Sequence, residues 1–341
     1  MQTAGPTVAT SPDARPPKAP WARWFKPRAP QAVTAVMMGE RCLAARVELA
    51  ERGGRMKLAA VAEGSAAELR GGHERRLFAD SQAVLVLRSH ERHLITLDKP
   101  EVPDAELHLA VRWPLAEALE VEAEQLLTSA LVLPRINPAL HPQVLAVAGR
   151  LDVARAHLKT LQDAGIKVRA IDVSDSALRG MSLLQGGHAD ADGWVVLAFI
   201  GADVCIGLLW RSEFCALRTL ALPVRRPRDE SEFEEHLALH IQRTSDHFER
   251  QATQLSVRHV LASMPSLSAE ARESVRATLP LSAKLFELGE AFEMSGTTAE
   301  HCEGDNDLTA LACVAASRLA DMHAPPQTSV ATSATPQEVA A

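Results

Sequence analysis

Short runs of apolar residues, bounded by turn-forming residues, recur along the chain and predict β-strands. The clearest block lies at residues 194–222 and predicts a meander of three strands joined by two tight turns. These strands are 194–200, 203–210 and 214–222. The uninterrupted apolar run Val195–Ala198 is typical of a strand in a sheet that is covered on both faces.

A comparable block opens the body of the chain. Five strands are predicted before the first convincing helix: 32–38, 41–49, 57–61, 83–87 and 93–97. The first two form a hairpin closed at Gly39 and Glu40, and the last two form another strand pair. Further strands, separated by helical segments, are predicted at 129–134, 143–148, 166–173, 257–262 and 283–288.

Apolar residues spaced three and four positions apart predict the helices. The helical segments are 104–113, 115–126, 152–164, 174–184, 230–254, 268–279 and 307–320. Asp104, Asp152 and Ser268 are the expected N-caps, because short polar side chains accept hydrogen bonds from the first free backbone N–H groups. Pro114 is expected to end the first segment, and Gly165 is expected just after the end of the third.

Strands followed by alternating helices and strands, repeated twice, predict an α/β protein with two lobes of mixed sheet. The length of 341 residues agrees with this division, because single cores stop growing near about 250–300 residues. We expect a first lobe at 31–185, with an insertion at about 100–165, and a second lobe at 186–323. The ends, 1–30 and 324–341, are rich in Pro, Ala, Thr and Ser and are expected to be disordered tails.

Composition narrows the range of functions. A net charge of −7 argues against nucleic-acid binding, because no basic field is available to attract a phosphate backbone. Five cysteines without a CxxC pair predict free thiols in a reducing compartment. The sequence has no apolar run long enough to span a membrane and no apolar segment of a signal peptide, so we expect a cytoplasmic protein.

The segment before the first strand has a different character. Residues 1–30 carry a net charge of +4, and Trp21, Trp24 and Phe25 are interleaved with cations such as Lys26. One interpretation is contact with an anionic membrane surface, where each nearby cation contributes about 1 kcal/mol. The other interpretation, which the shortness of the segment favours, is that the two tryptophans pack onto the body of the protein.

Three stretches of the sequence carry a family resemblance. They are Val102-Pro103-Asp104 followed by Arg112-Trp113, Leu158–Gly165 followed by Asp172, and Ile241-Gln242-Arg243 followed by Phe248-Glu249-Arg250. In these patterns the chain resembles the PilM-like family of actin-like pilus-assembly proteins, and most closely its MSHA-type (MshI) members. The resemblance covers residues of about 31–320.

The resemblance implies a two-lobed actin-like ATPase (ribonuclease H-like) fold with mixed sheets and an inserted small α/β subdomain. It also implies a cytoplasmic component, peripheral to the inner membrane, of a type IV pilus assembly platform. Such proteins engage the short cytoplasmic tail of a PilN-type bitopic membrane partner. The expected binding place is the groove between the first lobe and the insertion at 100–165.

The turns that bind ATP in this family are altered here. In place of Asp-Ile-Gly-Ser, Asp-Ile-Gly-Ala and Gly-Gly, the chain has Val36-Met37-Met38-Gly39, Phe199-Ile200-Gly201-Ala202 and Ser263-Met264-Pro265. A methionine cannot hold the cation that the aspartate handles, because Mg²⁺ requires oxygen ligands. We therefore expect a degenerate ATPase, a non-enzymatic scaffold for which ATP and Mg²⁺ are disfavoured ligands. A vestigial nucleotide site is marked by Gly39, Gly201, Ala202 and Asp203.

Two other functions fit the sequence less well. An active ATPase of the same fold would use displaced ligands such as Asp203 or Glu40, and a cytoplasmic component of a type II secretion platform would share the fold. The chain has no Walker A motif, GxSxG elbow or HExxH motif. His236 and His240 are four residues apart and fit a solvated helix face better than a zinc site. We therefore expect no catalytic residues and no metal.

Overall fold

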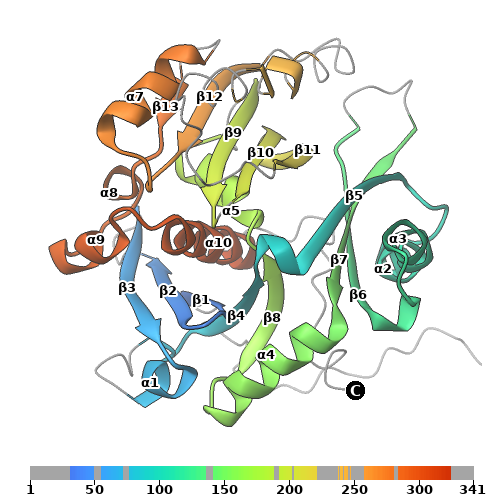
Figure 1. The fold of residues 1–341 in the computed structure, drawn as a ribbon, viewed down its shortest axis with the longest axis horizontal. Coiled ribbons are helices and arrows are strands. Elements are labelled where there is room, and N and C mark those ends of the chain that lie inside the picture. Colours follow the sequence, from blue (N-terminus) through green and yellow to red (C-terminus); the bar gives the residue numbers. More distant parts are fainter. Residues whose placement is uncertain are drawn as a thin grey trace, which may run out of the picture.

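The computed structural model describes most of the body of the chain. It covers residues 31–49, 55–71, 77–135, 141–187, 192–201, 203–220, 257–279 and 283–323, together with 237, 239, 240, 242–244 and 246. These residues form three β-sheets and the helices packed on them (Figure 1). Both predicted tails and most of the predicted helix 230–254 lie outside the described residues.

The first sheet has the strand order β3-β2-β1-β4-β8. Its strands are β1 (Ala32–Met37), β2 (Cys42–Leu49), β3 (Met56–Gly64), β4 (Gln82–Leu87) and β8 (Val168–Val173). β1, β2 and β3 form the predicted antiparallel meander, whereas β4 runs parallel to β1 and β8 runs parallel to β4. Every residue of β1 is buried, because both faces of the sheet are covered.

The second sheet repeats this arrangement with the order β11-β10-β9-β12-β13. Its strands are β9 (Gly193–Ile200), β10 (Asp203–Trp210), β11 (Glu213–Leu220), β12 (Val257–Ser263) and β13 (Ala283–Leu285). The first three are antiparallel, as predicted, and β12 and β13 are parallel to β9. The chain therefore builds the same five-stranded topology twice.

A third, antiparallel sheet has the order β5-β7-β6. It consists of β5 (Arg92–Asp98), β6 (Leu126–Val132) and β7 (Gln143–Arg150), and α2 (Leu107–Ala110) and α3 (Arg112–Leu119) pack on it. The predicted pairing of strands 83–87 and 93–97 is wrong, because β4 pairs with β1 and β8, whereas β5 pairs with β7. A 3₁₀ turn at Ser89–Glu91 separates β4 from β5, and the chain passes there from the first sheet to the third.

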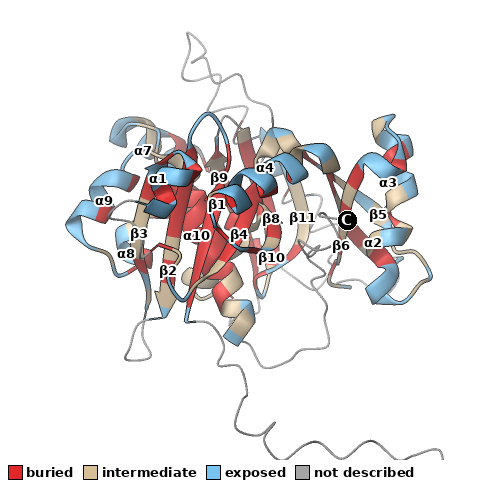
Figure 2. Ribbon diagram, turned by 90° about the horizontal axis from the view of Figure 1, so that it is seen from below, coloured by how far each residue is buried: buried red, intermediate tan, exposed pale blue. Residues whose placement is uncertain are grey.

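The remaining helices cover the faces of the first two sheets. They are α1 (Ala66–Gly71), α4 (Leu151–Asp163), α5 (Ser176–Leu184), α7 (Ala269–Thr278), α8 (Leu288–Ala291), α9 (Gly296–Cys302) and α10 (Asn306–His323). Helices α5 and α10 lie between the two sheets, in the largest apolar cluster (Figures 1 and 2). Helices α1 and α4 cover the outer face of the first sheet, and α7 covers that of the second. The sequence did not predict α1, α8 or α9.

Two predicted caps and one predicted helix end are wrong. Asp104 and Asp152 are not N-caps, because the 3₁₀ turn Asp104–Glu106 begins at Asp104 itself and α4 begins at Leu151, one residue before Asp152. Their carboxylates pair with Lys99 at 2.9 Å and with Arg150 at 2.6 Å. Pro114 lies inside α3, as its third residue. Backbone N–H groups in the first turn of a helix have no carbonyl partner within that helix, so proline is tolerated there. The predicted helix 115–126 therefore merges with α3 and ends at Leu119.

Other local predictions are confirmed. Ser268 caps α7, because its side chain accepts a hydrogen bond from the backbone N–H of Ala271. Gly165 follows α4 with a φ of 78°, a left-handed conformation that favours glycine. Within the partly described helix 230–254, Leu237 and Thr244 are buried. They are seven residues apart, about two helical turns, and so lie on the same face of the helix, as its apolar periodicity predicts. All five cysteines are free thiols.

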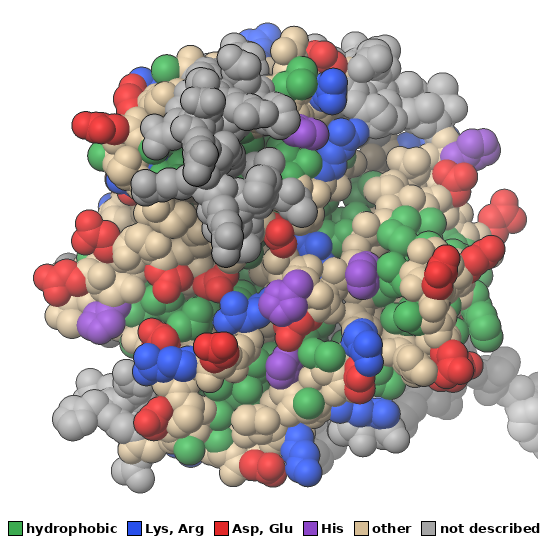
Figure 3. Space-filling model, in the orientation of Figure 1, with side chains coloured by type: hydrophobic (Ala, Val, Ile, Leu, Met, Phe, Trp, Pro, Cys, Tyr) green, Lys and Arg blue, Asp and Glu red, His purple; other side chains and the backbone are tan. Residues whose placement is uncertain are grey.

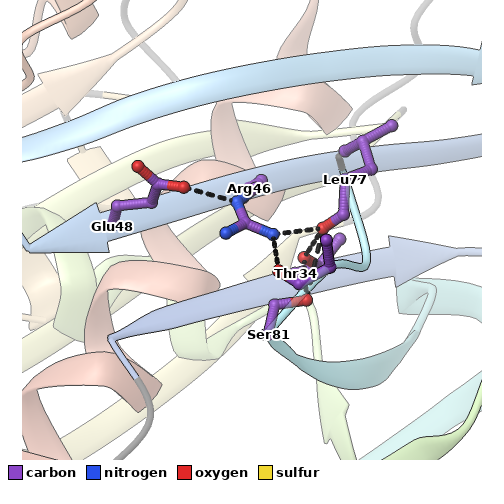
Figure 4. A network of polar contacts seen from close by, with 6 residues as sticks. Thr34, Arg46, Glu48, Leu77 and Ser81 are labelled. Carbon is purple, nitrogen blue, oxygen red and sulfur yellow. Dashed lines mark hydrogen bonds and ion pairs between the residues drawn. The ribbon is translucent and has the colours of Figure 1, made fainter. Parts of the chain in front are cut away.

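A polar network fixes the turn before β4 to the centre of the first sheet. Thr34, the only polar residue of β1, is buried, and its hydroxyl donates to the carbonyl oxygen of Leu77 at 2.5 Å. The same hydroxyl lies 2.9 Å from Ser81 Oγ. Arg46 of β2 donates to the Leu77 carbonyl at 3.1 Å and to Glu48 Oε1 at 2.6 Å (Figure 4). The network satisfies a buried hydroxyl that would otherwise destabilise the sheet.

Candidate functional site

The β9–β10 turn lies against the first residues of α10. The side-chain amide of Asn306 donates to the carbonyl oxygen of Gly201 at 3.3 Å. A Cβ atom at Gly201 would be 3.6 Å from Asp307 Oδ1, and Gly201 has a φ of 58°, so the turn requires glycine for its backbone conformation. The second of the two predicted phosphate-binding turns is therefore held by α10.

Arg88 connects the β1–β2 turn to the same end of α10. Its Nε donates to the carbonyl oxygen of Met38 at 2.6 Å, and its Nη1 donates to Asp307 Oδ2 at 3.0 Å. The guanidinium lies directly against Gly39, where a Cβ atom would be 2.6 Å from Nη2. Gly39 thus provides space for the arginine side chain. The space between the two turns is bridged by the protein's own ion pair.

The electrostatics of Asp307 oppose additional negative charge. Burial raises the pKa of Asp307, and the nearby carboxylate of Asp305 raises it further. The guanidinium of Arg88 lowers this pKa, but the net result is a pKa above the ordinary value. A carboxylate that is already costly to ionise would be further destabilised by an adjacent polyphosphate. The Asp307 carboxylate is therefore a poor neighbour for an additional anion.

The N-terminus of α10 is already occupied by carboxylates. A helix N-terminus attracts anions through its free N–H groups and its partial positive charge. Here Asp305 Oδ1 accepts from the backbone N–H of Leu308 at 2.9 Å, and Asp307 lies in the first turn. The anion that this helix end favours is thus supplied by the chain itself.

An open depression of about 410 Å³ lies beside this helix end. Its lining residues are Gly201, His301, Glu303, Gly304, Asp305, Asn306 and Asp307. Among these described residues three are carboxylates and none is lysine or arginine. Phosphate groups require N–H donors, cations or a metal ion at close range, and this lining supplies no lysine or arginine for that purpose.

The structure separates the predicted nucleotide residues. Gly39 and Gly201 lie at the two ends of the Arg88–Asp307 bridge. Asp203 opens β10, where it pairs across the hairpin with Ile200, and Glu40 is exposed in the first turn. Ala202 lies outside the described residues.

Two further family positions have structural partners. Ser263 and Met264 replace the expected glycine pair, and both are buried, so their side chains fill space that a glycine pair would leave free. Asp172 of β8 forms an ion pair with Arg318 of α10 and accepts a hydrogen bond from Ser176 Oγ at 2.6 Å. Asp172 therefore connects β8 to α10.

The sequence analysis missed Arg88 and Asp307. They are 219 positions apart, and each occupies an ordinary local position, just after a buried strand and in the first turn of a helix. The available signal was indirect. Met38 next to Gly39 indicated that the turn had lost its phosphate chemistry, but it did not indicate which side chain would fill the space.

A buried ion pair attaches the third sheet to the rest of the molecule. Arg92, the first residue of β5, donates through Nε and Nη2 to the two carboxylate oxygens of Asp175 at 2.6 and 2.5 Å. Nη2 also donates to Thr219 Oγ1 of β11 at 2.9 Å. The side chains of Arg92 and Asp175 are only 6% and 1% exposed. The bidentate geometry fixes the start of β5 against α5 and the second sheet.

The junction between the first and third sheets combines an apolar and a polar contact. Leu127 of β6 and Leu151 of α4 are partly buried against the apolar cluster of the first sheet. Beside them, His157 Nε2 lies 2.7 Å from Glu91 Oε1. Although burial raises the pKa of Glu91, hydrogen bonds from His157 and from the backbone N–H of Arg88 outweigh it, and the net pKa is lowered.

Because the pKa of Glu91 is lowered in the folded state, its carboxylate contributes stability above its ordinary pKa of 4.5. That contribution is lost as the pH falls from this value through the lower folded pKa. We therefore expect Glu91→Gln to lose stability at neutral pH and to show a smaller further loss in acid than the wild type. Urea unfolding at pH 7 and at about pH 3.5 measures this difference. Glu117→Gln, at an exposed position of α3, is the control; equal acid losses in wild type and Glu91→Gln would contradict the expectation.

No group of three His, Cys, Asp or Glu side chains in the described part of the chain is arranged to hold a metal ion. None of the described helices combines the length and the hydropathy that a membrane crossing requires.

Comparison with known proteins establishes the fold. No protein-family model and no curated protein sequence matches the chain. A chain of the PilM–PilN type IV pilus biogenesis complex is similar in structure, with a TM-score of 0.57 and 17% sequence identity; the match covers 84% of this chain and 98% of that chain. The cytoplasmic domain of EpsL, an inner-membrane component of the type II secretion system of Vibrio cholerae, has a TM-score of 0.44 and 11% identity over 83% of this chain and 94% of that chain.

A third similar structure is a protein of unknown function with an actin-like ATPase fold from Bacteroides thetaiotaomicron. It has a TM-score of 0.45 and 7% identity over 83% of this chain and 96% of that chain. The chain described here has the fold of that chain of the PilM–PilN complex, a mixed α/β architecture with several mixed sheets, which the sequence resemblance identifies as the actin-like ATPase fold.

Proposed function

We propose that the chain is a non-enzymatic scaffold of a type IV pilus inner-membrane assembly platform of the MSHA (MshI) type. In this proposal it binds the cytoplasmic tail of a PilN-type bitopic membrane partner. The observation that carries the proposal is the structural similarity to a chain of the PilM–PilN complex, which extends over 98% of that chain. The PilM-like sequence patterns, such as Val102-Pro103-Asp104 with Arg112-Trp113, support it.

The non-enzymatic part of the proposal rests on the closed space between the two turns. The Arg88 guanidinium lies against Gly39 and pairs with Asp307, so a phosphate would have to displace a partly buried ion pair. It would then compete with Asp307 for the same guanidinium and face the carboxylate of Asp305 as well. Gly39, Gly201, Ala202 and Asp203 are in this view remnants of a nucleotide site, and neither ATP nor Mg²⁺ is a ligand.

We place the partner's tail in the groove between the first lobe and the insertion at about 100–165. Leu127 and Leu151 offer partly exposed apolar surface at this junction, and the Glu91–His157 pair offers polar groups beside it. The buried Arg92–Asp175 pair holds the insertion in a fixed position, so the groove is preorganised and a bound peptide has less ordering to impose.

The same proposal fixes the location and the other contacts of the chain. It is cytoplasmic and peripheral to the inner membrane, with Trp21, Trp24, Phe25 and Lys26 available to contact the anionic surface. Nucleic acid is not a partner, given the net charge of −7.

A pull-down of inner-membrane pilus proteins on the immobilised chain tests the proposal. We expect the wild type to recover a PilN-type partner and Leu151→Glu to lose it, because a carboxylate would be buried in the apolar groove. Leu49→Glu places the same charge at an exposed position of β2 and is the matched control. If a chain without residues 1–30 loses the partner while Leu151→Glu keeps it, the tail and not the groove is the binding site.

A further inference from the structure

The outer face of α2 and α3 exposes large apolar side chains. Trp113 is 68% exposed and Leu109 is 50% exposed, the two highest values among the described large hydrophobic residues. They are four residues apart along consecutive helical turns and therefore lie on one face. Val121 and Val132, also exposed, belong to the same subdomain. We call the surface formed by Leu109 and Trp113 the α2–α3 face.

This exposure is not a consequence of incomplete packing. Leu107, Val111 and Leu115, on the opposite side of the same helices, are fully buried against the third sheet. The helix pair is thus apolar on both sides, whereas a helix at a protein surface has a polar outer side. A tryptophan on such a face is a side chain that commonly dominates the binding energy of an interface.

The surroundings of the α2–α3 face are strongly acidic. Residues 101–125 contain seven carboxylates and a single basic side chain of the Lys or Arg type, Arg112. Lys99 neutralises one of these carboxylates, Asp104, at 2.9 Å. In Figure 3 hydrophobic side chains lie among carboxylates over the subdomain that carries α2 and α3. An apolar centre with an acidic rim fits a ligand that is both aromatic and basic.

The chain itself contains a segment of this chemistry. Residues 21–28 read Trp-Ala-Arg-Trp-Phe-Lys-Pro-Arg, with three aromatic side chains and three cations. Charge and apolar character are therefore complementary between this segment and the α2–α3 face. No second stretch of the sequence combines three aromatic residues with three cations within eight positions.

The position of the segment along the chain favours contact with another copy. Trp24, in the middle of the segment, is seven residues before Gln31, a length that spans about 25 Å at most. Gln31 leads directly into β1 in the first sheet, whereas α2 and α3 lie on the far side of the third sheet (Figures 1 and 2). A segment tethered to β1 is thus better placed to reach the face of a neighbouring molecule.

We propose that the α2–α3 face binds residues 21–28 of a second copy of the chain. The contact is heterologous, with the segment of one molecule on the face of the next, so it propagates into longer assemblies unless it closes into a ring. The same aromatic and basic side chains would insert into an anionic membrane surface. The two uses of the segment exclude each other, and membrane binding would release the neighbouring copy.

Sedimentation velocity of the full chain over a range of concentrations tests the inference. We expect the wild type to associate, and the face variant Leu109→Ser/Trp113→Ser to associate at least tenfold more weakly. We expect the same loss for the segment variant Trp21→Ser/Trp24→Ser/Phe25→Ser. Leu49→Ser, an exposed leucine on β2, is the control and should associate like the wild type. A wild type that remains monomeric, or a face variant that associates like the wild type, would overturn the inference.

Mixing the two variants distinguishes this contact from a folding defect. The face variant retains an intact segment and the segment variant retains an intact face, so an equimolar mixture should form heterodimers and nothing longer. A mixture that stays monomeric would overturn the inference. Vesicles of phosphatidylglycerol and phosphatidylcholine should dissociate the wild-type assemblies. If the segment variant loses vesicle binding but keeps wild-type self-association, the segment serves the membrane alone; the inference then fails and the proposed function stands.

Discussion

Replacing Asp175 by alanine should lower the free energy of unfolding by about 3–5 kcal/mol, because it leaves the buried guanidinium of Arg92 without its charge partner. Arg92 donates two hydrogen bonds to this carboxylate, whereas the Thr219 hydroxyl, to which it also donates, is neutral. Since these groups hold β5 against α5 and the second sheet, the loss would also loosen the insertion that we propose as one wall of the partner groove. Urea unfolding and partner recovery measure the two effects.

Two variants make this expectation specific. Asp152→Ala removes the partner of Arg150, but both of those side chains are 64% exposed, so the loss of stability should be much smaller than for Asp175→Ala. The double variant Arg92→Met/Asp175→Leu removes both buried charges and should recover much of the stability that Asp175→Ala loses. Equal losses for Asp175→Ala and Asp152→Ala would show that the Arg92–Asp175 pair does not hold the subdomain.

Gly180→Ala should destabilise the protein by about 3 kcal/mol, at the upper end of the range for overpacked cores. A Cβ atom at this position of α5 would lie 2.0 Å from the carbonyl oxygen and 2.6 Å from the carbonyl carbon of Cys313 in α10. Both helices lie between the first and second sheets, so neither can move without disturbing both. Thermal unfolding should show a clearly lower midpoint than that of the wild type.

Gly289→Ala provides the matched control for Gly180→Ala. Gly289 is also a helical glycine, in α8, and a Cβ atom there would meet no other atom within 4 Å. Alanine should therefore be neutral or stabilising by about 0.5–1 kcal/mol, since it reduces the conformational freedom of the unfolded chain. If Gly180→Ala unfolds at the same temperature as Gly289→Ala, the close contact between α5 and α10 is not required.

Hydrophobic periodicity predicted most strands and the main helices, because the strands of the first two sheets are covered on both faces and read as apolar runs. It did not predict strand pairing. Strands 83–87 and 93–97 are neighbours in the sequence, yet a 3₁₀ turn between them sends one to the first sheet and the other to the third. Pairing depends on contacts between distant segments, which the local pattern does not contain.

The predicted helix caps failed because the helical elements begin earlier than the periodicity predicted. Asp104 is the first residue of a 3₁₀ turn and Asp152 is the second residue of α4, so neither takes the flanking N-cap position. Ser268 does precede the first residue of α7, and its side chain accepts from the backbone N–H of Ala271 as predicted. Periodicity places a helix start only to within one or two residues, whereas a cap depends on the exact position.

The candidate site was predictable only in part. Motif comparison found Gly39 and Gly201 and the loss of acidic residues beside them. Arg88 and Asp307, which fill the space, come from segments 219 positions apart, and only the folded arrangement brings them together. A motif can therefore indicate that a chemical function has been lost, but it cannot show which residues have taken the place of the ligand.

Calorimetric titration of the full chain with Mg-ATP decides whether the nucleotide site has been lost. We expect no heat beyond dilution, because Arg88 and Asp307 bridge the space between the two turns and carboxylates line the adjacent depression. Arg88→Ala should remain equally silent, since removing the guanidinium leaves Asp305 and Asp307 to repel the phosphates. In addition, no group of three His, Cys, Asp or Glu side chains among the described residues is arranged to hold the Mg²⁺. Binding of Mg-ATP to the wild type with micromolar affinity would show instead that the chain retains a nucleotide site.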